Sequence, residues 1–151
     1  RLCAALVEWC SADCGFLNSG LLMDGLHEGA VTKQDLHSIL PHPINPCMIR
    51  MKGAELKEII KQTLNEDWPN LEVKGLGFRG KVMGRFVYYN IHFSNHDILI
   101  GDSPIEPSKM YKLALPDMFT FGHFFPDLQR LEKKYFMPEF LRDVLEWKLK
   151  Q

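Results

Sequence analysis

Cysteine and histidine side chains that could hold a metal ion are the first candidates for chemistry in this chain. Cys10 and Cys14 lie close together, and His42 and Cys47 follow further along. Structural zinc usually takes two close pairs of ligands, and here the second pair is loose while Cys10 falls where the first predicted helix ends. We therefore interpret these cysteines and Cys3 as free, buried thiols. Free thiols fit a reducing compartment, so the cytoplasm is the expected location.

The glycine-rich residues 75–80 fit the pattern G-x-G-x-x-G of dinucleotide-binding sites. That site needs a helix that opens at the third glycine, so that its N-terminus faces the pyrophosphate. The residues after Gly80 are rich in valine, phenylalanine and tyrosine and predict a strand. Since an isolated match has little specificity, we interpret the stretch as a glycine-rich turn in which Phe78 or Arg79 can face a pocket.

Asn95, His96 and Asp97 are similar to the Asn-His-Asp/Glu motif of calcineurin-like phosphoesterases. Those enzymes use a two-metal site with further Asp, His and Asn ligands. The other ligand motifs do not occur in the chain, so we predict that Asn95 and His96 form a hairpin turn. No serine lies in a G-x-S-x-G-like elbow, and no nucleophile with its base is indicated.

Residues 119–125 are the most aromatic stretch of the chain. Two interpretations remain open for it. The favoured one places these rings in the core, and the other makes them a stacking wall for a flat ligand. One or two exposed rings would matter in the second case, because base–aromatic stacking stabilises a complex by roughly 1–3 kcal/mol per base.

The composition is that of one ordinary globular domain. The chain has 151 residues, of which 46% are hydrophobic and 25% charged. A formal net charge of -1 gives no electrostatic basis for binding nucleic acid or an anionic membrane. No apolar run approaches the ~20 residues of a membrane span. The chain begins at Arg1 within a helical pattern, which we interpret as a piece of a longer protein.

Apolar spacing and turn residues predict an α+β domain over residues 1–151. The spacing predicts helices over residues 2–9, 32–40 and 54–66, with two more that begin at Pro126 and Pro138. Strands are predicted over residues 14–17, 47–52, 97–100 and 109–115, with several within 71–93. Residues 88–91 and 97–100 are expected to pair around the turn at Asn95.

The order of motifs between residues 12 and 56 resembles the C-terminal, substrate-recognition domain of the 5'-nucleotidase family of two-domain metallophosphoesterases. In that family the stretch runs roughly N-G-G-G-I-R, G-x-I-T-x-x-D-L, L-P-F and a strand ending L-T-G-x-x-L. The corresponding residues here are Asn18-Ser19-Gly20, Thr32-Lys33-Gln34-Asp35-Leu36, Leu40-Pro41-His42-Pro43 and Met51-Lys52-Gly53-Ala54-Glu55-Leu56.

The resemblance implies a single domain with a mixed β-sheet flanked by helices. It also implies an N-terminal metallophosphoesterase domain that is absent from this chain. Two divalent metal ions belong to that domain, so we expect no cofactor in this one.

Several ligand contacts are also implied by the resemblance. Asn18, with Ser19 and Gly20 in place of the flanking glycines, is expected to contact sugar hydroxyls. His42 stands at the Phe position of L-P-F, from which the family clamps the base, and imidazole can still stack or bond a base edge. Asn45 belongs to the same predicted ligand loop.

Other positions depart from the family pattern. The second clamp residue, a Phe before G-G-D-G-Y, corresponds to Met118 with Phe119 beside it, and the acidic residue of that motif is missing. The family's Arg aligns with Met23, whose thioether cannot donate a hydrogen bond or balance charge. An alternative lining for an anionic or planar ligand would use imidazole and guanidinium groups. Its members are His42, His123, Arg79 and Phe78.

We therefore predict that the chain recognises the nucleoside or nucleotide of a 5'-nucleotidase-like phosphoester hydrolase and is inactive alone. Its expected partners are a nucleotide or related small phosphoester and its own N-terminal catalytic domain. The alternative is a structural or partner-binding module that keeps the fold without nucleotide binding. Met23 and the missing acidic residue favour the alternative, whereas Asn18 and the Pro41-His42-Pro43 turn favour a working pocket.

Overall fold

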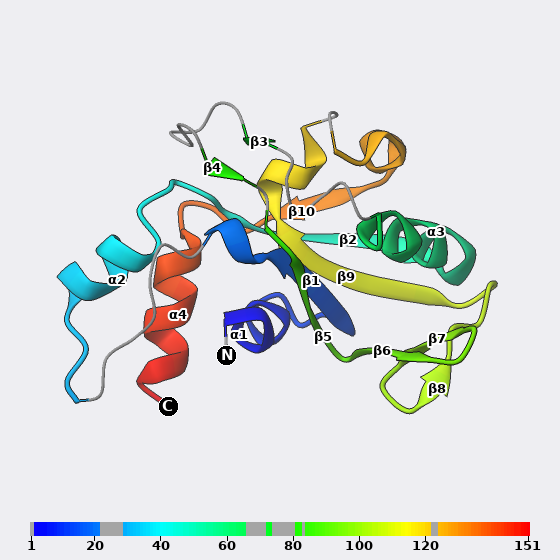
Figure 1. Ribbon diagram of the computed structural model, residues 1–151, viewed down its shortest axis with the longest axis horizontal. Coiled ribbons are helices and arrows are strands. Elements are labelled where there is room, and N and C mark those ends of the chain that lie inside the picture. Colours follow the sequence, from blue (N-terminus) through cyan, green and yellow to red (C-terminus); the bar gives the residue numbers. More distant parts are fainter. Residues whose placement is uncertain (1, 22–28, 66–71, 74–80, 83, 122–123) are drawn as a thin grey trace.

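A mixed sheet forms the centre of the structure, a computed structural model that describes residues 2–21, 29–65, 72–73, 81–82, 84–121 and 124–151. In the described residues β1 runs parallel to β9, and the other neighbouring pairs are antiparallel. The order across the sheet is β10 (Lys133–Tyr135), β2 (Pro46–Lys52), β9 (Met110–Pro116), β1 (Cys14–Asn18) and β5 (Phe86–Tyr89) (Figure 1).

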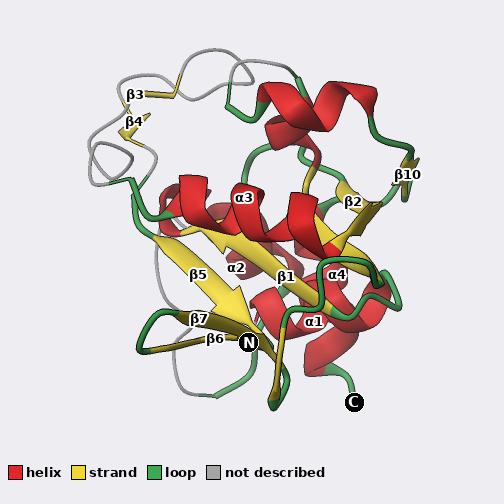
Figure 2. Ribbon diagram, turned by 90° about the vertical axis from the view of Figure 1, so that its right-hand side faces the viewer, coloured by secondary structure: helices red, strands yellow, loops and turns green. Residues whose placement is uncertain are grey.

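Helices cover both faces of this sheet (Figure 2). α1 (Leu2–Trp9) and α4 (Leu141–Leu149) lie on one face, and α2 (Lys33–Ile39) packs against α4. α3 (Gly53–Thr63) lies on the other face, over β2 and β9. The predicted α+β domain, with a mixed sheet flanked by helices, is confirmed. None of the helices in the described part of the chain is long and apolar enough to cross a bilayer.

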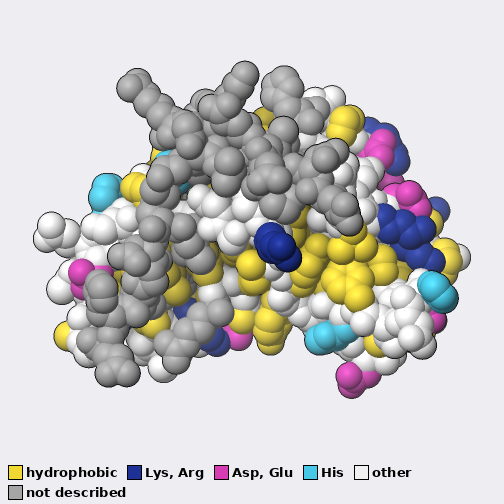
Figure 3. Space-filling model, viewed as in Figure 1, with side chains coloured by type: hydrophobic (Ala, Val, Ile, Leu, Met, Phe, Trp, Pro, Cys, Tyr) yellow, Lys and Arg dark blue, Asp and Glu magenta, His cyan; other side chains and the backbone are white. Residues whose placement is uncertain are grey.

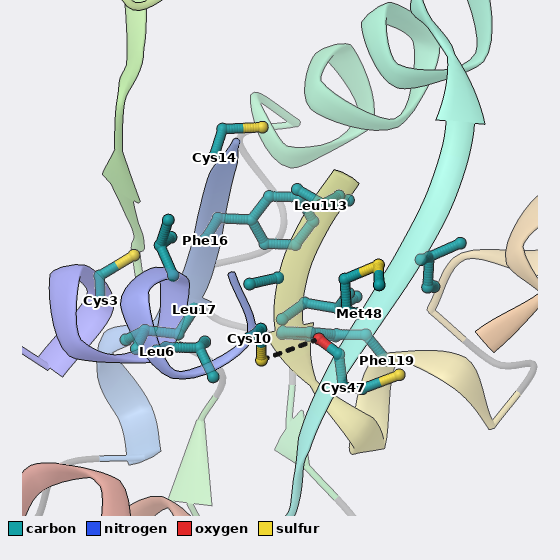
Figure 4. Close-up of a cluster of buried hydrophobic side chains, with 14 of the residues drawn as sticks. Cys3, Leu6, Cys10, Cys14, Phe16, Leu17, Cys47, Met48, Leu113 and Phe119 are labelled. Carbon is teal, nitrogen blue, oxygen red and sulfur yellow. Dashed lines mark hydrogen bonds between the residues drawn. The ribbon is translucent and has the colours of Figure 1, made fainter. Parts of the chain in front are cut away.

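The side chains of β1 pack against both faces of the sheet, because side chains alternate along a strand. A Cβ atom at Gly15 would meet the side chain of Val7 in α1 at 2.6 Å, so this position faces α1. Phe16 points the other way, and its ring centroid lies 5.9 Å from that of Phe119 (Figure 4). All residues of β1 are buried, which explains why its sequence shows no polar alternation.

A second, small sheet consists of β6 (Ile91–Ser94), β7 (Asp97–Ile100) and β8 (Ser103–Pro104). Asn95 adopts a positive φ of 51° between β6 and β7, which confirms the predicted turn. The predicted pairing of residues 88–91 with 97–100 is confirmed only for Ile91, which pairs with Ile100, and is wrong for Tyr88 and Tyr89. β7 pairs with β6, while Tyr88 and its neighbour belong to β5 and pair with β1. Tyr88 lies opposite Phe16 in the main sheet, and its hydroxyl group lies 2.6 Å from that of Thr63 in α3, which holds β5 apart from the hairpin.

The start of α2 agrees with the sequence prediction, whereas the start of α4 does not. The Thr32 side chain accepts from the Asp35 N–H at 3.1 Å, and Asp35 in turn accepts from the Thr32 N–H at 2.8 Å. This capping box opens α2 as predicted. The helix expected from Pro138 instead begins at Leu141. The reason is the Asp143 carboxylate, which accepts from the Phe140 N–H at 2.7 Å and fixes the start three residues later.

Three short 3₁₀ helices and one pair of two-residue strands complete the described elements. The helix predicted from Pro126 is the 3₁₀ helix η4, with proline in its first turn. The other elements are η1 (Ser19–Leu21), η3 (Asp117–Thr120), η4 (Pro126–Arg130), β3 (Glu72–Val73) and β4 (Lys81–Val82). Residues 75–80, which fit G-x-G-x-x-G, lie outside the described residues.

Gly53 at the start of α3 is held against the segment that leads into β9. Its N–H donates to the Lys109 carbonyl at 2.8 Å, and a Cβ atom here would overlap the Glu106 carbonyl oxygen. The same Cβ would approach the Ile105 side chain to 2.8 Å. The sequence therefore needs glycine where the chain passes so close to other backbone.

Replacing Gly53 by alanine should destabilise the domain by about 1–3 kcal/mol, because the backbone of Glu106 must shift to admit the methyl group. Urea denaturation followed by circular dichroism would measure the loss. Glu58→Ala on the exposed face of the same helix is the matched control, with a change within about 0.5 kcal/mol. A Gly53→Ala variant as stable as the parent would contradict this account of the α3 start.

Candidate functional site

The strand directions bring three predicted ligand segments to one edge of the sheet. β1 and β9 are parallel, so their carboxyl ends, at Asn18 and Pro116, face the same way. β2 is antiparallel to β9, and its first residue, Pro46, pairs with Pro116. The loop before β2, the turn after β1 and η3 after β9 therefore meet at this edge. Sequence separation hides this proximity, since about a hundred positions lie between Asn18 and η3.

Asn18 is the last residue of β1 and has no exposed surface. It is two positions beyond Phe16, so its side chain lies on the same face of the sheet. In the antiparallel pair its register partner is Phe86 of β5. Asn18 is thus a buried polar residue at the border between the aromatic core and the sheet edge.

Ser19 and Gly20 form a turn that is fastened to the segment before β5. The Ser19 N–H donates to the Arg85 carbonyl at 2.8 Å, and the Arg85 N–H donates to Ser19 Oγ at 3.0 Å. Gly84 has a φ of +72°, and a Cβ atom there would lie 2.8 Å from the Gly20 nitrogen. The turn therefore packs against Gly84 and Arg85. Ser19 and Gly20 themselves are partly exposed to solvent.

The loop of residues 40–45 carries His42 and Asn45. His42 is half-buried, and its carbonyl accepts from the Ile44 N–H at 2.9 Å. Asn45 is 8% exposed, and its Nδ2 donates to the Glu139 carbonyl at 2.7 Å. The amide of Asn45 thus serves as an anchor of the loop, whereas His42 as a whole is half-buried and the Nε2 atom of its imidazole is buried.

Met118 and Phe119 of η3 have no exposed surface. The ring of Phe119 lies 5.6 Å from that of Phe86 and 5.5 Å from that of Phe125. The favoured core interpretation of residues 119–125 is confirmed for Phe119 and Phe125. Phe121, which is 50% exposed, is the described ring of this stretch with the most surface available for stacking. The sequence indicated an aromatic stretch but not which ring would reach the surface.

Asp117 is a titratable residue at this edge that the sequence reasoning missed. It is 9% exposed, and its N–H donates to the Asn45 carbonyl at 3.0 Å. Burial raises the pKa of its carboxyl group from 3.8 to about 6, although hydrogen bonds from the backbone of Asn45 and Met118 oppose the shift. The available signal was its position directly after the strand end at Pro116, where polar residues meet ligands in open sheets.

The remaining predicted positions lie outside the described residues. They are Met23, Phe78, Arg79 and His123.

The cysteines occupy the core rather than this edge. Cys3, Cys10, Cys14 and Cys47 are buried and unpaired as disulfides, and burial raises the pKa of each thiol to about 12. Figure 4 shows them among apolar side chains, with the Cys10 thiol donating to the Cys47 carbonyl at 4.0 Å. Within the described ranges no His, Cys, Asp or Glu side chains group into a possible metal site.

A separate cavity of about 500 Å³ lies near the opposite end of β9, where that strand begins. Two of its polar side chains, Tyr111 and Asp13, form hydrogen bonds within the fold. The Tyr111 hydroxyl accepts from the Glu106 N–H at 2.9 Å, and the Asp13 carboxylate accepts from the Lys112 N–H at 2.8 Å. The edge at Asn18, His42 and η3 is therefore the candidate site.

Comparison with known proteins gives a family and a set of similar folds. The family model of the 5'-nucleotidase C-terminal domain matches residues 2–124. An uncharacterized metallophosphoesterase of Bacillus subtilis (strain 168), YunD, is 47% identical over 161 residues, which cover 99% of this chain and 35% of that protein. The resemblance to the 5'-nucleotidase family is confirmed. The chain spans about a third of the length of this curated relative.

Two solved structures share the fold over 99% of this chain. A putative 5'-nucleotidase from Staphylococcus aureus, solved with alpha-ketoglutarate, has a TM-score of 0.74 at 16% identity, and the match covers 32% of its chain. The NAD nucleotidase NadN from Haemophilus influenzae has a TM-score of 0.73 at 14% identity, with 29% of its chain covered. At such low identity these likenesses concern the fold alone.

The raised pKa of Asp117 predicts how stability depends on pH. A raised pKa means that the folded chain binds the proton more tightly than the unfolded chain. The stabilisation from protonated Asp117 is therefore complete below about pH 4 and is lost as the pH rises through about 6. Between these values the wild type should lose on the order of 2 kcal/mol relative to Asp117→Asn, which cannot ionise.

Urea denaturation of both proteins at several pH values in this window measures the difference. Asp127→Asn, at an exposed position of η4, is the control and should track the wild type at every pH. A constant stability difference between wild type and Asp117→Asn would show that the carboxyl group does not titrate in this range.

Proposed function

Because the chain belongs to the 5'-nucleotidase C-terminal domain family, we propose that it is the substrate-recognition part of a metal-dependent phosphoester hydrolase. Its ligand is a nucleotide or a related small phosphoester. The family match and the 47% identity to a protein described as a metallophosphoesterase support this class of parent. In this proposal the two divalent metal ions and the hydrolytic chemistry belong to an N-terminal domain of the parent protein.

One observation carries the proposal for a binding site in these residues. The parallel pairing of β1 with β9 brings together Asn18, the loop of His42 and η3, which lie far apart in the sequence. These are the segments that the family resemblance assigns to the ligand, and open sheets bind ligands beyond the carboxyl ends of their strands. The convergence therefore supports a ligand site at this edge.

Each segment has a proposed role in that site. In the Asn18-Ser19-Gly20 turn the partly exposed Ser19 and Gly20 meet sugar hydroxyls, and the buried Asn18 supports them from the strand end. The half-buried His42 stacks on the base or bonds its edge. Met118 and Phe119 are buried, so their proposed role is to support the site from the core without touching the ligand. Phe121 offers an exposed ring. Asn45 fixes its loop. The proposed contribution of three further residues rests on the sequence alone, and they are Phe78, Arg79 and His123.

A partner-binding module without nucleotide recognition is the second candidate function. The observation that favours it is exposed apolar surface on β5 and β6. Val87, Tyr89 and Phe93 are 43%, 41% and 45% exposed. Figure 3 shows hydrophobic side chains at several places on the face of the molecule seen in Figure 1. Such surface is typical of protein contacts. This candidate predicts no saturable response to nucleotides.

Titration of the isotope-labelled chain with AMP, adenosine, a UDP-sugar and a 2',3'-cyclic nucleotide tests the proposal by NMR. We expect saturable amide shifts in residues 18–20, 41–45 and 119–121. His42→Ala should weaken AMP binding about fivefold or more, since it removes a stacking surface worth roughly 1 kcal/mol or more. His96→Ala, at an exposed turn far from this edge, is the control and should bind normally. Equal affinity in both variants would contradict the role of His42.

The chain alone should show no phosphoester hydrolysis with added divalent metal ions, because the residues that would activate water belong to the other domain. The measurement is phosphate release from AMP and from bis(p-nitrophenyl) phosphate by the purified chain. Turnover at constant specific activity through repeated purification would overturn the division of labour between the two domains.

A further inference from the structure

The last part of the chain runs back along the predicted ligand loop. Residues 133–142 lie beyond the family match, which ends at residue 124. The Phe136 N–H donates to the Pro46 carbonyl and the Leu141 N–H to the Ile44 carbonyl, both at 2.9 Å. Asn45 also bonds the Glu139 carbonyl, so three consecutive residues, Ile44 to Pro46, are hydrogen-bonded to residues 136–141. We call residues 133–142 the C-terminal segment.

Arg142 contacts the loop directly before His42. Its Nη1 donates to the Leu40 carbonyl at 3.1 Å and to the Pro41 carbonyl at 3.3 Å, the two carbonyls directly before His42. The guanidinium group lies 4.9 Å from the centre of the Phe140 ring, which restricts its orientation. Hydrogen bonds from a charged donor are stronger than neutral ones, so this contact should dominate the fixation of the loop start.

The same segment also contacts the other side of the candidate site. The hydroxyl groups of Tyr135 and Thr120 lie 3.0 Å apart, which links β10 to η3. The Asp117 N–H in η3 bonds the Asn45 carbonyl, so loop, η3 and C-terminal segment form one connected set. A change in the C-terminal segment can therefore alter both sides of the site together.

We propose that Arg142 is a positioning residue for ligand binding: through the Leu40 and Pro41 carbonyls it holds the loop that presents His42. This inference rests on the proposed function, in which His42 meets the base of a nucleotide. A loop with two prolines and one short internal bond gains its conformation mainly from such long-range contacts. A loop that is already ordered loses less entropy on binding, which raises affinity. Arg142 itself does not touch the ligand.

Two variants of Arg142 and one control test the proposal in the same chain. Arg142→Met keeps the apolar stem and removes the donors, whereas Arg142→Lys keeps a charged donor and should restore part of the effect. Lys150→Met, at an exposed position just after α4, is the matched control, because it removes a cation whose ion pair with Glu146 is at the surface.

Hydrogen exchange of the Ile44 amide reports the loop without any ligand, since this amide bonds the His42 carbonyl. In Arg142→Met we expect Ile44 to exchange about tenfold faster or more, and AMP affinity to fall by a similar factor. Amides in the middle of β9 should exchange as in the wild type. Arg142→Lys should be intermediate, and Lys150→Met should match the wild type in both measurements.

The outcomes separate this proposal from the proposed function. Unchanged exchange of Ile44 in Arg142→Met would overturn the positioning role, whether or not AMP binds. Faster exchange of Ile44 and of β9 in equal measure would also overturn it, because the effect would then be global destabilisation. If Ile44 alone exchanges faster while the wild type binds none of the tested nucleotides, Arg142 does hold the loop and the nucleotide assignment fails.

Discussion

The parallel pairing of β1 with β9 is the constraint on which the candidate site depends. Had these central strands been antiparallel, the turn after Asn18 and η3 would lie at opposite ends of the sheet. β2 pairs with β9 along seven residue positions, which fixes where the loop of residues 40–45 ends, at Pro46. A one-residue slip in that register would turn the side chains of β2 to the wrong face, so burial specifies it strongly.

The two sides of the candidate site are held by different kinds of contact, aromatic packing beneath η3 and hydrogen bonds to backbone carbonyl groups in the His42 loop. Phe16 lies in contact with the rings of Phe86, Phe119 and Phe125 at centroid distances of 5.5–5.9 Å. Rings packed in this way permit little change of volume. The loop around His42 is instead held by backbone carbonyl groups, and such contacts do not depend on the side chain at that position.

Local signals predicted much of the fold because they involve neighbouring residues. The capping box of Thr32 and Asp35 and the turn at Asn95 are of this kind. The start of α4 was missed because a carboxylate at Asp143, not the proline at 138, fixes it. The burial of Asp117 and Phe119 depends on strands that pair far along the chain, and no local pattern reports it. The contact between Arg142 and the loop joins residues about a hundred positions apart and was equally hidden.

The two positions that the family resemblance assigns to a base clamp, 42 and 118, differ in how a substitution would affect the stability of the fold. Met118 has no exposed surface, so a larger ring there would need repacking of the core around Phe119. His42 is half-buried on a loop whose anchors are the carbonyls of Leu40 and Pro41 and the amide of Asn45. Its side chain can change without loss of those anchors. In the proposed site, the side chain at position 42 can therefore change while the hydrogen bonds from the C-terminal segment to the loop are kept.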